Sequence, residues 1–174
     1  SVLSAHPPSA VACSPLRCGV AETHWADQPQ LAGLKLLART EQVLAAHEAA
    51  MQGWDDALML NKERQVISSS KGNLFLFKGA DVTTPCLNRC GIAETRLQVL
   101  IGNLLPQMGY SVSSRPVLLS ECLEADALIV TNTVMGVTAI ESIVEATFSG
   151  ARGVALARRL QSALSEHIAA CDAQ

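Results

Sequence analysis

Apolar side chains recur every three or four residues in three stretches of the chain, which predicts three helices. Their ranges are Leu34–Met51, Thr95–Met108 and Arg152–Ala170. The first stretch is rich in alanine and is followed by Gly53, a residue type that commonly ends helices. One further helical turn is expected over Ser120–Glu124.

Short apolar runs bounded by turn residues predict β-strands. The expected strands are Ala10–Cys13, Ala57–Leu60, Gln65–Ile67, Asn73–Phe77, Asp81–Thr83, Tyr110–Leu118, Ala127–Val130 and Val137–Val144. The segment Ser14–Gln30 is rich in Pro, Gly and polar residues and is expected to be a loop. The four strands between residues 57 and 83 resemble an antiparallel meander. Because helices and strands mix without strict βαβ alternation, the predicted fold is α+β with a mixed, barrel-like sheet and flanking helices.

Composition narrows the class of protein. A chain of 174 residues, 49% hydrophobic and 17% charged, fits one globular domain. A net charge of −3 and 3% aromatic residues argue against a nucleic-acid partner. No apolar run reaches the roughly 20 residues of a membrane span, and no signal peptide is recognisable at the N-terminus. We therefore expect a cytoplasmic protein without a membrane partner.

The cysteines and histidines do not form a metal-site pattern. The six cysteines have irregular spacings, no C-x-x-C pair exists, and the four histidines do not fall at zinc-ligand spacing. Reduced thiols are the expected state, and no metal site is predicted.

Lys35 is a candidate nucleophile. It stands between Leu34 and Leu36, at the start of the first predicted helix. Apolar surroundings lower the pKa of a lysine because burial disfavours the charged form, and only the free amine attacks a carbonyl. The alternative is a lysine whose head reaches solvent. Arg39 and Glu41 nearby are most simply solvated or structural.

Two further segments have the composition of ligand-binding loops. Asn88–Arg96 is a glycine-containing turn that leads into a helix, where free backbone amides can hold a phosphate. Thr131–Val137 follows a buried strand and combines hydroxyls, an amide and a glycine. An ordinary loop–helix junction and a polar turn are the respective alternatives.

Taken in order, these segments resemble the fold-type IV enzymes that use pyridoxal phosphate (PLP), among them aminotransferases and aminodeoxychorismate lyase. The lysine motif spans Leu31 to Leu44, with Lys35, Arg39 and Glu41. Further matches are Gly72-Asn73-Leu74-Phe75, Thr84-Pro85, Cys90-Gly91-Ile92-Ala93 and Thr131 to Gly136. The resemblance runs from about Ala10 to Leu164 and is greatest to the lyase.

The resemblance implies a role for each motif. Lys35 would bind PLP covalently and later move protons. Thr95 and Arg96, mainly through their backbone amides, and Thr133 with the Val134 amide would hold the cofactor phosphate. The implied reaction converts 4-amino-4-deoxychorismate to 4-aminobenzoate and pyruvate, a step of folate synthesis.

The chain departs from the family pattern at several positions. Ser68 stands where the family usually has the glutamate that pairs with the pyridine nitrogen of PLP. Glu94 replaces a glycine of the phosphate loop, and Leu97 stands at its arginine position. A serine would not hold the ring nitrogen protonated as a carboxylate does. This favours an elimination driven by aromatisation over transamination.

The family also sets expectations for organisation. The chain is expected to be one PLP-binding domain, residues 1–174, without the smaller N-terminal domain of the family, and to form a homodimer with a small-molecule substrate. Two alternatives stay open. One is an aminotransferase for branched-chain or D-amino acids. The other is an interaction module that keeps the fold without the cofactor.

Overall fold

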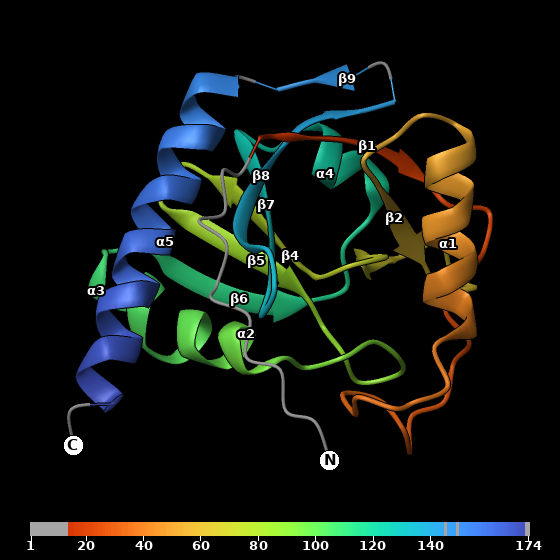
Figure 1. Ribbon diagram of the computed structural model, residues 1–174, viewed down its shortest axis with the longest axis horizontal. Helices are drawn as coiled ribbons and strands as arrows, with labels where there is room; N and C mark the ends of the chain where they lie inside the picture. The colour runs from red at the N-terminus through yellow and green to blue at the C-terminus, as the bar shows by residue number, and fades with distance from the viewer. Residues whose placement is uncertain (1–13, 145, 149, 173–174) are drawn as a thin grey trace, which may run out of the picture.

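The computed structural model describes residues 14–144, 146–148 and 150–172 (Figure 1). The strand predicted over Ala10–Cys13 lies outside these residues. Within them, the strands form one mixed sheet in the order β3-β2-β1-β8-β7-β4-β5-β6, with β9 paired to β8. Their bounds are β1 Leu16–Val20, β2 Asp56–Leu60, β3 Val66–Ser69, β4 Asn73–Lys78, β5 Asp81–Pro85, β6 Ser111–Arg115, β7 Ala127–Asn132, β8 Gly136–Ile143 and β9 Ala146–Thr147.

The central strands are apolar on both faces, which explains their continuous apolar runs. On β4, Leu74 and Leu76 pack in one core cluster, whereas Phe75 and Phe77 pack in the cluster on the opposite face. The same division holds along β7, the antiparallel neighbour of β4. A strand covered on both faces has no polar side to alternate.

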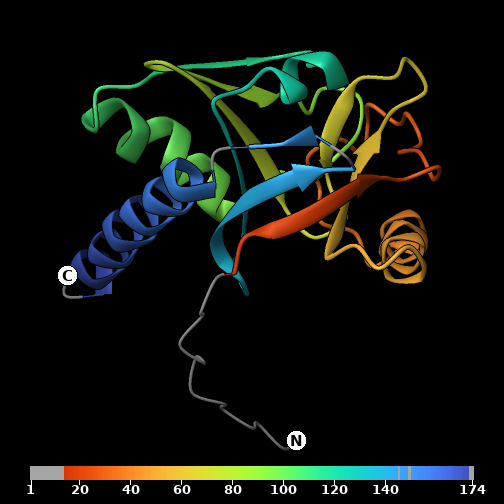
Figure 2. The same ribbon diagram turned by 90° about the horizontal axis from the view of Figure 1, so that it is seen from above.

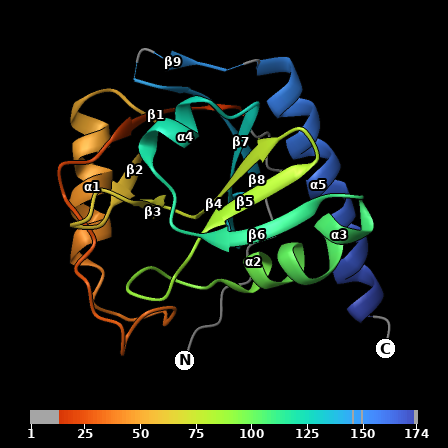
Figure 3. The ribbon, with the colours of Figure 1, turned by 180° about the vertical axis from the view of Figure 1, so that it is seen from behind.

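The sheet curls back on itself, so its first and last strands approach each other (Figure 3). The backbone N–H of Val66, at the start of β3, donates to the Val117 carbonyl at 2.8 Å, two residues after β6. An antiparallel bridge between Gln65 and Leu118 adds to this contact. The predicted α+β class with a barrel-like mixed sheet is confirmed.

Helices cover the outside of the curled sheet (Figure 2). The long helix α5 (Gly150–Asp172) and the continuous helical segment α2 (Thr95–Val99), η1 (Leu100–Leu104) and α3 (Leu105–Gln107) bury Leu100, Leu105, Leu160 and Leu164 against one face. Helix α1 (Thr40–Met51) packs Ala45 and Ala49 against β2. The short α4 (Leu119–Leu123) contributes Cys122 to the core cluster of Leu74. None of these helices is long and apolar enough to cross a membrane.

Three expectations were wrong in detail. The predicted loop Ser14–Gln30 contains β1, which is held by parallel pairing to β2 and β8. The meander is interrupted, because β4 pairs with β7 rather than with β3. The first helix begins at Thr40 instead of Leu34. In each case the controlling contacts come from distant parts of the chain, which local pattern does not encode.

Candidate active site

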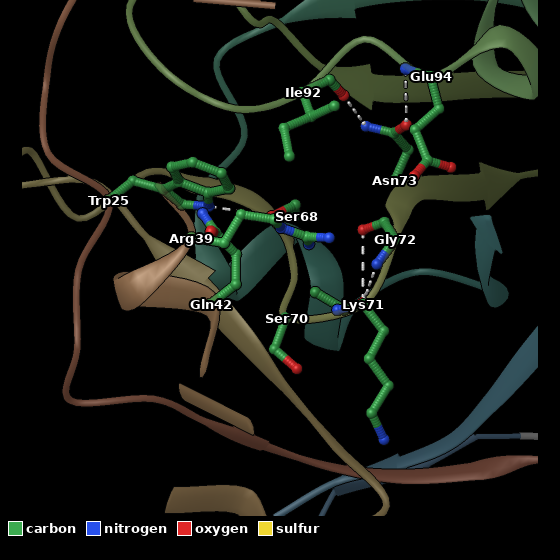
Figure 4. A pocket seen from close by; sticks show the side chains of 11 residues that line it. Trp25, Arg39, Gln42, Ser68, Ser70, Lys71, Gly72, Asn73, Ile92 and Glu94 are labelled. Atoms are coloured by element: carbon green, nitrogen blue, oxygen red, sulfur yellow. Dashed lines mark hydrogen bonds between the residues drawn. The ribbon is translucent and has the colours of Figure 1, made fainter. Parts of the chain in front are cut away.

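A small open pocket lies where the turn between β3 and β4 meets the start of α1 and the loop that precedes α2 (Figure 4). Antiparallel register places Asn73 opposite Thr131, so two of the predicted motifs become neighbours. Gly72 allows this approach, because a Cβ there would lie 2.3 Å from the Thr131 carbonyl oxygen. The wall consists of Trp25, Arg39, Gln42, residues 68–73, Ile92 and Glu94.

Asn73 fixes the glycine-containing loop over the pocket. Its side-chain Nδ2 donates to the Ile92 carbonyl at 2.8 Å, and its Oδ1 accepts from the Glu94 amide at 3.4 Å (Figure 4). Asn73 is 4% exposed, so both bonds are shielded from water. The side chain therefore determines where the loop Gly91–Thr95 lies relative to β4.

Asn132 does the same for the loop between β7 and β8. Its Oδ1 accepts from the Val134 and Met135 amides at 2.9 and 2.6 Å, and its Nδ2 donates to the Lys71 carbonyl at 2.9 Å. The Arg96 guanidinium donates to the Asn132 carbonyl at 2.7 Å. Thus the start of α2 and the 133–136 loop are joined, and the side chains of Thr133 and Val134 are exposed beside them.

Lys35 lies in the loop that precedes α1, and not in the helix as predicted. Its side chain is 58% exposed, and its Nζ is 3.4 Å from Oε1 of Glu94. The flanking Leu34 and Leu36 are exposed as well, so the apolar surroundings expected for the lysine are absent from the described residues. Gly33, just before this segment, pairs its backbone with the loop that begins at Gly91.

That pairing brings the lysine loop beside the loop that contributes Ile92 and Glu94 to the pocket wall. The Gly33 amide donates to the Gly91 carbonyl at 3.0 Å, and the Ala93 amide donates to the Gly33 carbonyl at 3.0 Å. Gly33 has φ +80°, in the left-handed region that favours glycine. The lysine motif and the Gly91–Thr95 loop, almost 60 residues apart in sequence, are thereby held side by side.

Ser68 lies at the other end of the pocket. It is buried, and its Oγ accepts a hydrogen bond from Nε1 of Trp25 at 3.0 Å (Figure 4). Trp25 is fixed in turn by its own amide, which donates to the Leu60 carbonyl at 2.8 Å. The hydroxyl of Ser68 keeps its proton free to donate to a ligand.

The structure adds a residue that the sequence argument treated as solvated or structural. Arg39 is half-buried in the pocket wall, and its Nε is buried without a hydrogen-bond partner among the described residues. Arg39 also lines an adjoining pocket of about 260 Å³, together with Leu34 and Leu36 of the lysine loop. Its position four residues after Lys35 was the signal available in the sequence.

The cysteines of the described chain are free thiols, namely Cys18, Cys86, Cys90, Cys122 and Cys171. Burial, together with the nearby Asp27 and Glu41 carboxylates, raises the pKa of the Cys90 thiol to about 12. Cys90 adjoins the Gly91 loop, but a thiol held protonated is not a nucleophile. No cluster of potential metal ligands occurs in the residues that the structure describes.

Comparison with known proteins defines the class. The profile of the family described as amino-transferase class IV matches residues 1–143. The chain belongs to this family, and its fold is that of the fold-type IV enzymes.

Individual relatives carry two different activities in their names. The chain is 36% identical over 128 residues to the aminodeoxychorismate lyase of Vibrio harveyi, covering 74% of this chain and 47% of that protein. It is 31% identical to a probable branched-chain-amino-acid aminotransferase of Aquifex aeolicus over 106 residues, 61% of this chain and 34% of that protein.

Solved structures show the same pair of activities. The 4-amino-4-deoxychorismate lyase of Pseudomonas aeruginosa superposes with a TM-score of 0.79 at 31% identity, over 87% of this chain and 55% of that one. The PLP form of the branched-chain aminotransferase of Thermobaculum terrenum gives 0.81 at 25% identity, over 90% and 52%. The chain spans about half the length of these relatives.

Proposed function

We propose that the chain is the lysine-bearing part of a PLP-dependent lyase that converts 4-amino-4-deoxychorismate to 4-aminobenzoate and pyruvate. The observation that supports the proposal is the pairing of the lysine loop with the Gly91–Thr95 loop, because Nζ of Lys35 is then 3.4 Å from Glu94, a residue of the pocket wall to which Ser68 also belongs. The 36% identity to the Vibrio harveyi lyase supports the choice of reaction.

Donor groups next to the pocket fit the phosphate of PLP. The amides of Thr95 and Arg96 begin α2, where Glu94 provides no side-chain cap, so they are available to a phosphate. Thr133, which is exposed, lies in the loop that Arg96 holds to the same helix start, whereas the Val134 amide expected to bind the phosphate already donates to Oδ1 of Asn132 at 2.9 Å. The buried Oγ1 of Thr131, nearby on β7, has no hydrogen-bond partner within the described residues. A ligand rich in acceptor oxygens would satisfy these donors.

When bound, PLP would supply the electron sink for breaking a bond at the carbon next to the substrate nitrogen. The exposed amine of Lys35 would attach the cofactor, and after release it would take the proton from that carbon. Departure of the enolpyruvyl group as pyruvate then leaves an aromatic ring. Lys35 therefore acts both as the anchor and as the base.

Ser68 favours elimination over transamination. Its Oγ already accepts from the Trp25 indole, so its remaining proton is suited to bind an unprotonated ring nitrogen. A neutral ring is a weaker electron sink than one held protonated by a carboxylate. Aromatisation of the product compensates for this in the lyase reaction, but a transaminase has no such compensation.

Arg39 would bind a carboxylate of the substrate. Its guanidinium lines both pockets, and no ion pair or hydrogen bond engages it in the described part of the chain. A planar guanidinium without a protein partner is the side chain best suited to hold a carboxylate in two hydrogen bonds.

A branched-chain aminotransferase is the second candidate, favoured by the Aquifex aeolicus and Thermobaculum terrenum relatives. Two assays on the same preparation separate the candidates. Release of 4-aminobenzoate from aminodeoxychorismate supports the lyase, and amino transfer to a branched-chain keto acid at a comparable rate overturns it.

The cofactor is tested by spectroscopy. The purified protein with PLP is expected to show a yellow imine band, and borohydride reduction followed by peptide mapping is expected to label Lys35. A protein that stays colourless with added PLP would instead be an interaction module of the same fold.

A further inference from the structure

Glu94 occupies the loop that is expected to bind the cofactor phosphate, and its side chain faces the lysine. The side chain is 10% exposed, and Oε1 is 3.4 Å from Nζ of Lys35. Its second oxygen, Oε2, is buried and has no hydrogen-bond partner among the residues that the structure describes. The sequence alone left open whether this carboxylate turns to solvent, and the structure shows that it points inward (Figure 4).

The backbone accepts a side chain at this position without strain. Glu94 has φ −76° and ψ 155°, an extended conformation that any residue adopts. The family glycine at this site is therefore not needed for its conformational freedom. What the substitution changes is charge, because it adds a carboxylate where a phosphate would approach.

The ion pair is asymmetric. Lys35 is 58% exposed and can be solvated without Glu94, whereas Glu94 is nine-tenths buried and depends on the lysine to compensate its charge. Removing one partner of a buried pair leaves the remaining charge uncompensated, which is costly.

We propose that Glu94 opposes the binding of a phosphorylated cofactor and narrows the preference of the site for PLP over its unphosphorylated form, pyridoxal. This rests on the proposed function, in which Lys35 attaches the cofactor. The Lys35 ammonium first loses a proton to solvent; its amine then attacks the aldehyde carbon, a C=N bond forms and one water leaves. Glu94 thereby loses the ammonium ion that compensates it, while the phosphate brings further negative charge to the same loop. The loss of the ammonium ion occurs with either compound, whereas the repulsion by phosphate occurs only with PLP. Comparing the binding of PLP with that of pyridoxal therefore separates these two effects.

The experiment measures the dissociation constants of PLP and of pyridoxal, by titration of the yellow band, for the whole protein and for Glu94→Gln. The variant keeps the size of the side chain and removes its charge. We expect the variant to bind PLP about tenfold more tightly, which corresponds to about 1.4 kcal/mol of repulsion removed. The dissociation constant of pyridoxal is expected to change less. The matched control is Glu124→Gln, which removes the carboxylate of an ion pair with Lys78 whose side chains are 71% and 72% exposed. This control is expected to leave both constants unchanged.

A second variant, Glu94→Gly, restores the family residue and is expected to shift the PLP-to-pyridoxal ratio in the same direction. Thermal unfolding of each protein confirms that the comparison is between folded chains. An unchanged ratio in both Glu94 variants, with PLP still trapped at Lys35 by borohydride, overturns this inference and leaves the proposed function intact. Failure to trap PLP at Lys35 in any of the proteins overturns the proposed function, and the inference with it.

Discussion

Asn73 offers the sharpest test of how the site is assembled. Its replacement by alanine removes the hydrogen bonds to the Ile92 carbonyl at 2.8 Å and from the Glu94 amide at 3.4 Å. A net hydrogen bond contributes about 1 kcal/mol, and a buried partner left unsatisfied adds to the loss. Because the second bond is long, we expect Asn73→Ala to lower the free energy of unfolding by about 2 kcal/mol, mostly through Ile92.

The assay is urea-induced unfolding at equilibrium, combined with a PLP titration. Since Asn73 positions the loop that carries Glu94 and leads to Thr95, we also expect PLP to bind about tenfold more weakly. The control is Asn88→Ala in the same connection, an exposed position where substitutions usually stay within about 0.5 kcal/mol. Equal unfolding midpoints for Asn73→Ala and the unmodified chain would refute the conclusion that the Asn73 side chain holds the Gly91–Thr95 loop. A loss of stability with undiminished PLP affinity would show that Asn73 supports the fold and not the site.

Three further predictions concern binding, packing and pH. Arg39→Gln is expected to raise the KM for the substrate about tenfold with a smaller effect on kcat, because the guanidinium would bind the substrate carboxylate equally in the ground state and in the transition state. An unchanged KM in steady-state kinetics contradicts this role of Arg39. Gly72→Ala is expected to destabilise the chain by about 1–3 kcal/mol in urea titrations, because its Cβ would meet a β7 carbonyl oxygen at 2.3 Å, whereas Gly102→Ala, with open space around it, is expected not to destabilise. Burial raises the pKa of Cys90 and of Cys122 to about 12 from an ordinary 9.0, so the unfolded chain loses these protons at a lower pH than the folded chain does. The contribution of the two thiols to the free energy of unfolding is therefore fully present below pH 9.0 and falls between pH 9.0 and about 12, and a free energy of unfolding that stays constant over that range argues against their burial.

The pattern of apolar residues along the chain identified most strands, because each of these strands is buried along the same residues that form its apolar run. It missed β1, where only Cys18 and Gly19 are buried, Arg17 is exposed, and Leu16 and Val20 are half-buried. That strand exists because β2 and β8 lie on either side of it. Pairing between distant segments is a tertiary effect, and a single sequence does not display it.

For the site, sequence motifs identified the segments but not their contacts. Lys35 was expected in apolar surroundings and instead lies in an exposed loop before α1, next to Gly33, which pairs with the Gly91–Thr95 loop. Arg39 was overlooked because an arginine at a helix start is usually solvated, and only the pocket shows that part of its guanidinium group is buried. The side-chain roles thus depended on loop pairing that no spacing rule specifies.

The two departures from the family pattern act at opposite ends of the proposed cofactor site. Ser68, bonded to Trp25, removes a negative charge from the ring-nitrogen end, and Glu94 adds one beside Lys35. The first weakens the electron sink, and the second places a carboxylate 3.4 Å from Nζ of Lys35. After taking the substrate proton, Lys35 would carry an ammonium group whose charge this carboxylate balances, and the departing enolpyruvyl fragment must gain a proton to become pyruvate. The carboxylate that we propose disfavours the phosphate would therefore hold the proton-bearing side chain in place for the second half of a lyase reaction, in which aromatisation makes a strong sink unnecessary. A transaminase would gain nothing from a weaker electron sink combined with a carboxylate beside Lys35. The positions of Ser68 and Glu94 together therefore favour elimination more than either does alone.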